Sequence, residues 1–161
     1  MLATRSLRRS ALMLAVIASP ALFVACDDDD PAEPDPEPTF NRVEFTLTGG
    51  GQTRVDTVTT TGVQTGNRNF PGGTTTVAIT NTRFLRADGT VDPVVTAADF
   101  ELRHSATGTS TGVTFALTAG QSFQGAISGL TNGARTIRML LWHKGDNHED
   151  FSQILTLQIG P

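Results

Sequence analysis

Apolar and polar residues alternate in short runs from Asn41 to the end of the chain. In the first run, Val43, Phe45 and Leu47 are separated by polar residues, and three glycines at positions 49–51 end the run. A period of two places every second side chain on one face of an extended chain, so this run predicts a strand that is buried on one side. No stretch longer than about ten residues has helical spacing. The pattern therefore predicts an all-β fold.

The alternation recurs often enough to predict about seven to nine short strands. A second strand is expected over residues 53–60, a glycine-rich loop over residues 62–73, and an edge strand over residues 91–95, where Pro93 cannot donate a ladder hydrogen bond. The inward positions of the remaining strands are Thr75, Val77 and Ile79; Phe100 and Leu102; Val113, Phe115 and Leu117; Phe123 and Ile127; Ile137, Met139 and Leu141; and Leu155, Leu157 and Ile159. This number and spacing resemble immunoglobulin-like domains, which implies a single antiparallel β-sandwich; a closed barrel is the alternative.

The composition agrees with strands and shows no charge bias in the domain. The chain has 16 glycines, 9 phenylalanines and only 17% charged residues, and Lys144 is its only lysine. Few charges disfavour long surface helices. Three of the 12 basic residues lie at the N-terminus and seven of the 16 acidic residues lie between positions 27 and 38, which leaves nine of each from Thr39 onward. Because a nucleic-acid-binding domain carries an excess of positive charge, we expect no nucleic acid as partner.

The first 25 residues have the pattern of a signal peptide. Arg5, Arg8 and Arg9 precede an apolar stretch over residues 11–25. About 15 apolar residues are too few for a bilayer span, which needs roughly 20, but they match the core of a secretory signal. We therefore expect the chain to be exported.

The end of this stretch, Leu22-Phe23-Val24-Ala25-Cys26, resembles the lipobox of bacterial lipoproteins. The resemblance implies that signal peptidase II cleaves before Cys26 and that this cysteine is lipid-modified. The lipid would hold the protein at a membrane of the cell envelope, facing the periplasm or the cell exterior. Cys26 is also the only cysteine of the chain, so it has no intrachain disulfide partner. The alternative is an ordinary signal peptidase that cuts nearby, for instance after Ala21.

Residues 26–39 are predicted to be a tether between the lipid and the domain. Positions 27–38 hold seven acidic residues, four prolines and no basic residue. Like charges repel one another and prolines favour an extended chain, so this segment has no means of joining a core. The expected organisation is a signal peptide over residues 1–25, the tether over 26–39 and a β domain over 40–161.

Two of the three histidines lie in one acidic segment near the C-terminus, between His143 and Asp150. The ring of His143 should point inward, because it continues the inward parity of the strand before it, and His104 likewise continues an inward set. If the two strand ends are neighbours, His104, His143 and His148 converge with Asp146 or Asp150. Three imidazoles and a carboxylate suit Zn²⁺ or Cu²⁺. The alternative is a solvated hairpin loop made of turn-forming residues.

Motifs for catalysis are absent from the sequence, which has no nucleophile elbow, no phosphate-binding glycine loop and no zinc-protease helix motif. We therefore expect a non-enzymatic binding or structural module at the cell envelope, attached to the membrane by the lipid on Cys26, with a protein or small molecule as its partner. The alternative is an envelope metal-binding protein for zinc or copper. A hydrolase ranks third.

Overall fold

The computed structural model describes residues 36–160, and this part of the chain contains strands and no helix, which confirms the all-β class. The predicted signal peptide, Cys26 and most of the predicted tether lie outside the described residues. A helix long and apolar enough to cross a membrane does not occur in residues 36–160. The strands are β1 (Arg42–Gly49), β2 (Gln52–Thr59), β3 (Gln64–Gly66), β4 (Asn69–Phe70), β5 (Thr76–Leu85), β6 (Phe100–Ser105), β7 (Thr114–Leu117), β8 (Gly125–Ser128), β9 (Gly133–His143) and β10 (His148–Ile159).

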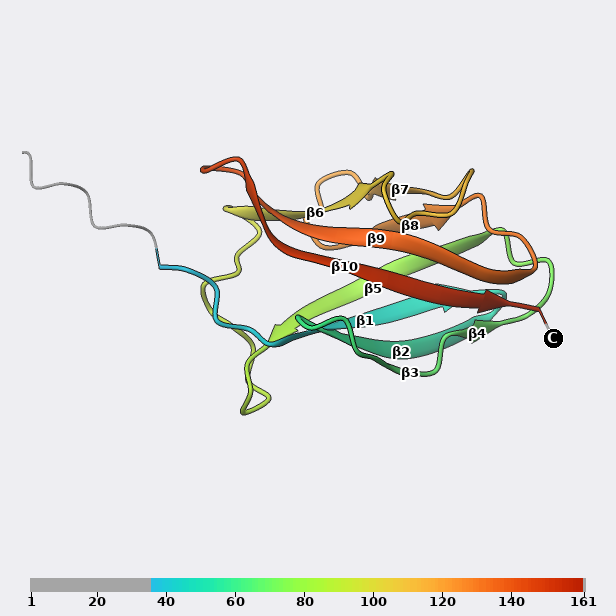
Figure 1. The fold of residues 1–161 in the computed structure, drawn as a ribbon, viewed down its shortest axis with the longest axis horizontal. Coiled ribbons are helices and arrows are strands. Elements are labelled where there is room, and N and C mark those ends of the chain that lie inside the picture. Colours follow the sequence, from blue (N-terminus) through green and yellow to red (C-terminus); the bar gives the residue numbers. More distant parts are fainter. Residues whose placement is uncertain (1–35, 161) are drawn as a thin grey trace, which may run out of the picture. The chain divides into compact units, whose positions relative to one another are not determined.

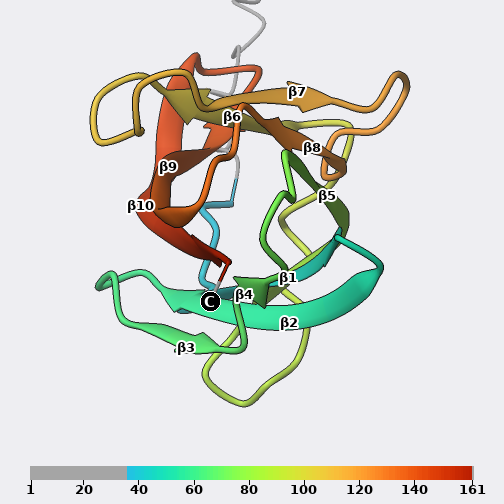
Figure 2. The same cartoon turned by 90° about the vertical axis from the view of Figure 1, so that its right-hand side faces the viewer.

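The strands form two sheets (Figure 1). One sheet has six strands in the order β3-β2-β1-β5-β8-β7, and the other has four in the order β4-β10-β9-β6. The pairings are antiparallel except that of β4, which runs parallel to β10. Seen from the end, the two sheets curve around a common interior (Figure 2).

Both sheets contribute to one hydrophobic core. In β1, Val43, Phe45 and Leu47 are each fully buried, as their alternation predicts. The four-stranded sheet adds the predicted inward residues of β9 and β10, which belong to the same cluster: Ile137, Met139, Leu141, Leu155, Leu157 and Ile159. Burying alternate large side chains from both sheets is the main source of stability in such an arrangement.

Residues 62–73 are not only the loop that the glycines predicted, because β3 and β4 lie within them. The side chain of Gln64 in β3 joins the two sheets: its amide nitrogen donates to the carbonyl oxygen of Thr156 in β10 (3.2 Å), and the backbone nitrogen of Thr156 donates to its amide oxygen (3.0 Å). Strands this short carry no apolar alternation, so the hydrophobic pattern contains no signal for them.

Residues 91–95 do not form the predicted edge strand; only Val91 pairs, through an isolated bridge to the end of β5. The buried side chain of Asp92 explains the difference. Its carboxylate accepts hydrogen bonds from the backbone nitrogens of Val94 (3.1 Å) and Thr39 (2.5 Å). The carboxylate thus accepts from backbone N–H groups that would otherwise pair with a neighbouring strand. Through these bonds, Asp92 fixes both this loop and the start of the domain.

Three segments meet at one end of the domain: residues 36–40, the connection between β5 and β6, and the tip of the β9–β10 hairpin (Figure 1). Lys144 in the hairpin tip attaches it to this connection. Its backbone nitrogen donates to the carbonyl oxygen of Asp99 (2.8 Å), and its Nζ donates to the carbonyl oxygen of Ala97 (2.8 Å). The histidine-rich segment therefore lies against the β5–β6 connection.

Candidate metal-binding site

The site begins with the turn between β9 and β10. His143 ends β9, His148 begins β10, and the two are a cross-strand pair. Between them, Asn147 lies in the left-handed region (φ 57°), and its N–H donates to the carbonyl oxygen of His143 (3.0 Å). Asparagine tolerates this conformation better than most side chains do. The local sequence thus forms a tight turn that holds the two histidines opposite each other.

His143 is buried at the end of the inner face, with 7% of its surface exposed, in agreement with its parity in β9. Its ring stacks on Phe100 of β6, with 4.4 Å between ring centroids and an interplanar angle of 18°. It meets the ring of His148 nearly at a right angle, with centroids 5.2 Å apart. The hydrophobic pattern missed Phe100 as a partner, because alternation within a strand does not reveal which strand lies beside it.

A β-bulge in β10 brings Asp150 to the same place. The pairing with β9 shifts by one residue between Glu149 and Phe151, which leaves Asp150 as the extra residue. Phe151 consequently points into the core, at 4% exposure, while Asp150 Oδ1 lies 3.1 Å from His148 Nε2. Bulges redirect side chains in this way and are frequent beside functional sites.

His143, His148 and Asp150 together form a compact group of ligand atoms. One such atom from each residue lies within 4.8 Å of the other two. Two polar atoms of the group, His143 Nδ1 and Asp150 Oδ2, are buried and have no hydrogen-bond partner in residues 36–160. The side chains that carry them are 9% and 10% exposed. Leaving such an atom without a partner costs about 1–3 kcal/mol, so both atoms are suited to a ligand.

The other two predicted metal ligands lie outside this group. Asp146 is near, with Oδ2 3.3 Å from His143 Nδ1, but no hydrogen bond joins the two atoms and the side chain of Asp146 is 56% exposed. His104 does not converge with the other histidines, contrary to expectation. It lies opposite Met139, whereas Phe100 lies opposite His143. Four residues of strand separate the two positions, about 13 Å at 3.3 Å per residue, because parity fixes the face of a strand but not the position along it.

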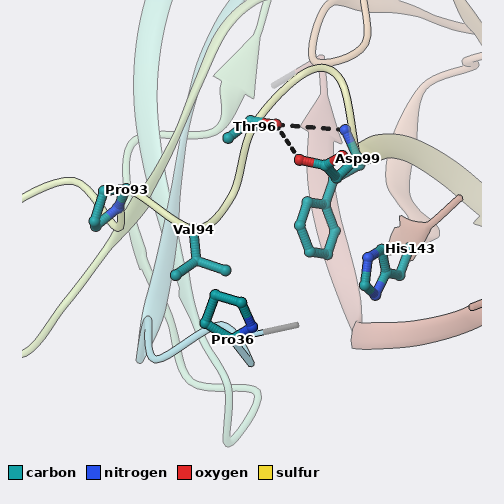
Figure 3. Close-up of a pocket in the computed structure, with 7 residues that line it drawn as sticks. Pro36, Pro93, Val94, Thr96, Asp99 and His143 are labelled. Atoms are coloured by element: carbon teal, nitrogen blue, oxygen red, sulfur yellow. Dashed lines mark hydrogen bonds between the residues drawn. The ribbon is translucent and has the colours of Figure 1, made fainter. Parts of the chain in front are cut away.

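A pocket of about 400 Å³ adjoins the group, and His143 forms part of its wall. In Figure 3, Pro36 and Val94 lie on one side of the pocket and His143 on the other. Thr96 and Asp99 are joined by two hydrogen bonds, from Thr96 Oγ1 to Asp99 Oδ2 (2.6 Å) and from the backbone nitrogen of Asp99 to Thr96 Oγ1 (3.4 Å). The lining residues are Pro36, Pro93, Val94, Thr96, Asp99, Phe100 and His143. Apart from His143, the sequence predicts none of them as a ligand.

Two imidazoles and one carboxylate are a donor set for Zn²⁺ or Cu²⁺. A tetrahedral zinc with ligands at 2.0–2.2 Å separates neighbouring ligand atoms by about 3.3 Å. The separations of up to 4.8 Å must therefore shorten by about 1.5 Å when an ion binds. His148 is the side chain free to make this movement, since it is 41% exposed at the hairpin tip. Three protein ligands leave a fourth position of the ion open.

Comparison with known proteins assigns no family to this geometry. No family model, no curated protein and no solved structure matches the chain. The role of the group is therefore inferred from its own residues and distances.

Proposed function

We propose that this protein is an exported lipoprotein whose β domain binds Zn²⁺ or Cu²⁺ at the tip of the β9–β10 hairpin, through His143, His148 and Asp150. The observation that carries the metal assignment is the pair of buried ligand atoms without partners, His143 Nδ1 and Asp150 Oδ2. A bound dication accepts lone pairs from the ligands and offsets the negative charge of a carboxylate that is nearly removed from water.

A histidine–carboxylate ion pair without a metal is the competing explanation of the group. His148 Nε2 and Asp150 Oδ1 are 3.1 Å apart and form such a pair when the ring is protonated. A second such pair joins His143 Nδ1 to Asp146 Oδ2 at 3.3 Å, but Asp150 Oδ2 stays buried without a partner in residues 36–160. Because a metal ion draws all three side chains into one set of bonds, it accounts for more of the observed geometry.

The wider role that we propose is that of a non-enzymatic binding or structural module at the cell envelope. The lipobox-like Val24-Ala25-Cys26, followed by an acidic segment, supports export and a lipid anchor at Cys26. The two sheets around one core support an immunoglobulin-like β-sandwich as the fold of the domain. The proposal assigns metal ligands and no catalytic residue.

Metal-dependent stabilisation tests the proposal. An ion that binds only the native state raises the free energy of unfolding by RT ln(1 + [L]/Kd), about 2.7 kcal/mol at a hundredfold excess over Kd. For a domain of this size, that change raises the melting temperature by roughly 10 °C. We expect zinc or copper to produce such a shift in the wild-type protein in differential scanning calorimetry, and His143→Ala to lose most of it.

His104→Ala is the matched control, because it removes the same side chain from the same domain but outside the ligand group. Each protein retains the acidic residues 27–37, so cation binding there contributes equally to the three melting curves. His104→Ala should keep the full shift. The proposal is overturned if the wild-type protein shifts by less than about 2 °C, or if His143→Ala shifts as much as the wild type.

A further inference from the structure

Two histidine–aspartate pairs lie at the turn of the β9–β10 hairpin. His148 Nε2 is 3.1 Å from Asp150 Oδ1, and His143 Nδ1 is 3.3 Å from Asp146 Oδ2. The rings of the two histidines meet at a steep angle, with centroids 5.2 Å apart. The metal-binding function proposed above uses three of these four side chains and leaves Asp146 without a role.

We propose that Asp146 supplies the fourth ligand, so that the hairpin encloses the ion and the ion acts as a structural staple of the turn. The inference rests on the proposed metal-binding function and deepens it. It adds a ligand and it assigns a role to the ion, because a four-coordinate ion with four protein ligands has no position left for a substrate or a carried molecule.

The unpartnered nitrogen of His143 is the one beside Asp146. This nitrogen, Nδ1, is buried and makes no hydrogen bond within residues 36–160, and it is the atom that the proposed function assigns to the ion. Neighbouring ligand atoms of a tetrahedral zinc are about 3.3 Å apart, and Asp146 Oδ2 is 3.3 Å from His143 Nδ1. The two atoms therefore already have the separation of two ligands of one ion.

The carboxylate of Asp146 has to turn toward the other two ligands when the ion binds. Asp146 is not in the group of three whose ligand atoms all lie within 4.8 Å of one another. It lies in the turn between β9 and β10, and its side chain is 56% exposed. Exposed side chains change rotamer within nanoseconds, so the carboxylate can reach the ion without a rearrangement of the backbone.

The charges at the turn favour four protein ligands. Asp146 and Asp150 carry two negative charges, which one dication balances, while the imidazoles bind it as neutral ligands. Lys144 lies in the same turn, but its Nζ donates to the carbonyl oxygen of Ala97 (2.8 Å) rather than to either carboxylate. The ion is then the group that offsets both negative charges, and this lowers the cost of holding Asp150 away from water.

The competing role for Asp146 is to orient the ring of His143 from outside the coordination sphere. Such a carboxylate binds the ring nitrogen that faces away from the metal, and its removal lowers metal affinity by about 10–100-fold. That role requires His143 to bind the ion through Nε2, whereas the buried, unpartnered atom is Nδ1. Because both roles predict a loss of affinity in a variant of Asp146, the test has to measure the coordination of the ion as well.

Visible absorption of the Co²⁺-loaded protein measures this coordination, because the spectrum of cobalt responds to the number and kind of its ligands. The probe is thiocyanate, a small anion that replaces metal-bound water. We expect the wild type to show the intense absorption of four-coordinate cobalt, and thiocyanate to leave this spectrum unchanged. In Asp146→Ala, water takes the fourth position, so Co²⁺ affinity should fall at least tenfold and thiocyanate should cause a saturable spectral change.

Glu149→Ala is the matched control. Glu149 is an exposed carboxylate of the same hairpin, but its cross-strand partner is Trp142 and it does not belong to the ligand group. The control should bind Co²⁺ as the wild type does and should remain insensitive to thiocyanate.

The outcomes separate the inference from the function on which it rests. If thiocyanate changes the spectrum of the wild type, the fourth position is open and the inference is overturned while the metal function stands. The inference is equally overturned if Asp146→Ala remains insensitive to thiocyanate, even with weakened Co²⁺ binding, because Asp146 then only positions His143. If Co²⁺ binds no better to the wild type than to His143→Ala, the metal function itself fails.

Discussion

Asp92 is a buried carboxylate that the fold keeps ionised. Burial by itself raises the pKa of Asp92, but hydrogen bonds from Thr39 and Val94 and the charge of Arg86 outweigh this effect, so the pKa lies below the ordinary value of 3.8. The guanidinium of Arg86 lies 3.0 Å from Oδ1. Charge-assisted hydrogen bonds of this kind are about twice as strong as neutral ones.

At Asp56, which is also fully buried, the effect of burial on the pKa is larger than that of the neighbouring donors and charges. Burial is the largest effect and raises its pKa, and a hydrogen bond from Gln64, the charge of Arg68 and a hydrogen bond from the backbone of Thr57 offset only part of it. Arg68 comes no closer than 4.0 Å, and Oδ1 of Asp56 has no hydrogen-bond partner in residues 36–160. Deeper burial at Asp56 and the larger number of close donors at Asp92 thus separate the two aspartates.

Replacing each aspartate by asparagine should change stability in opposite directions. The lowered pKa of Asp92 gives a stabilisation that is present above pH 3.8 and is lost as the pH falls through the folded-state pKa. Asp92→Asn should therefore lower the free energy of unfolding at neutral pH by about 2 kcal/mol.

The raised pKa of Asp56 gives a contribution to stability that is present below pH 3.8 and is lost as the pH rises through the folded-state pKa. Asp56→Asn should therefore raise the melting temperature at neutral pH by about 4 °C.

Thermal melts of both variants from neutral pH to well below pH 3.8 check these signs. The difference between Asp56→Asn and the wild type should shrink as the pH falls through the raised folded-state pKa of Asp56, whereas the difference at Asp92 should persist to about pH 3.8 and shrink only below it, where Asp92 is protonated in the folded chain as well. A loss of stability at neutral pH in Asp56→Asn, or a difference at Asp92 that grows toward acid, would contradict the assignment.

The sequence predicts a single strand well where apolar and polar residues alternate over many positions, as in β1, β9 and β10. The same parity correctly oriented His143 inward. It placed His104 on an inward face as well, but parity contains no information on register, and His104 lies opposite Met139, away from His143. Asp150 reached the site through a β-bulge, which results from packing between strands and has no signature in the hydrophobic pattern.

The turn of the β9–β10 hairpin provides a prediction at this scale. Asn147→Ala keeps the β-carbon in the left-handed region but removes the side-chain amide that makes this conformation accessible to asparagine, which costs about 1 kcal/mol. It should also weaken zinc or copper binding, because the turn holds His143 and His148 in register. Asn147→Gly is the control, since glycine adopts this conformation freely. Calorimetric melts with and without metal measure both effects, and equal behaviour of the two variants would contradict the role of the turn.

At the scale of the whole domain, the site could not be predicted because the chain crosses between sheets. β5 lies in the six-stranded sheet, β6 in the other, and β7 and β8 in the first again before β9. This order brings residues 36, 93–100 and 143–150 to one end of the domain, although they are far apart in the sequence. The strand pattern determines which faces are buried, whereas the order of strands in each sheet is decided by long-range packing.

At the scale of the whole protein, the last prediction concerns attachment to the membrane. Val24-Ala25-Cys26 follows an apolar stretch and precedes Asp27, so cells that express the full chain should incorporate labelled palmitate into it. Cys26→Ala should abolish the label and release the protein from the membrane fraction, because one cysteine is the only site for the lipid. His104→Ala serves as the control for substitution as such and should label normally. Equal labelling of the wild type and Cys26→Ala, or none in either, would refute the lipid anchor. Such a result would not bear on metal binding by the hairpin, which the melting experiments test separately.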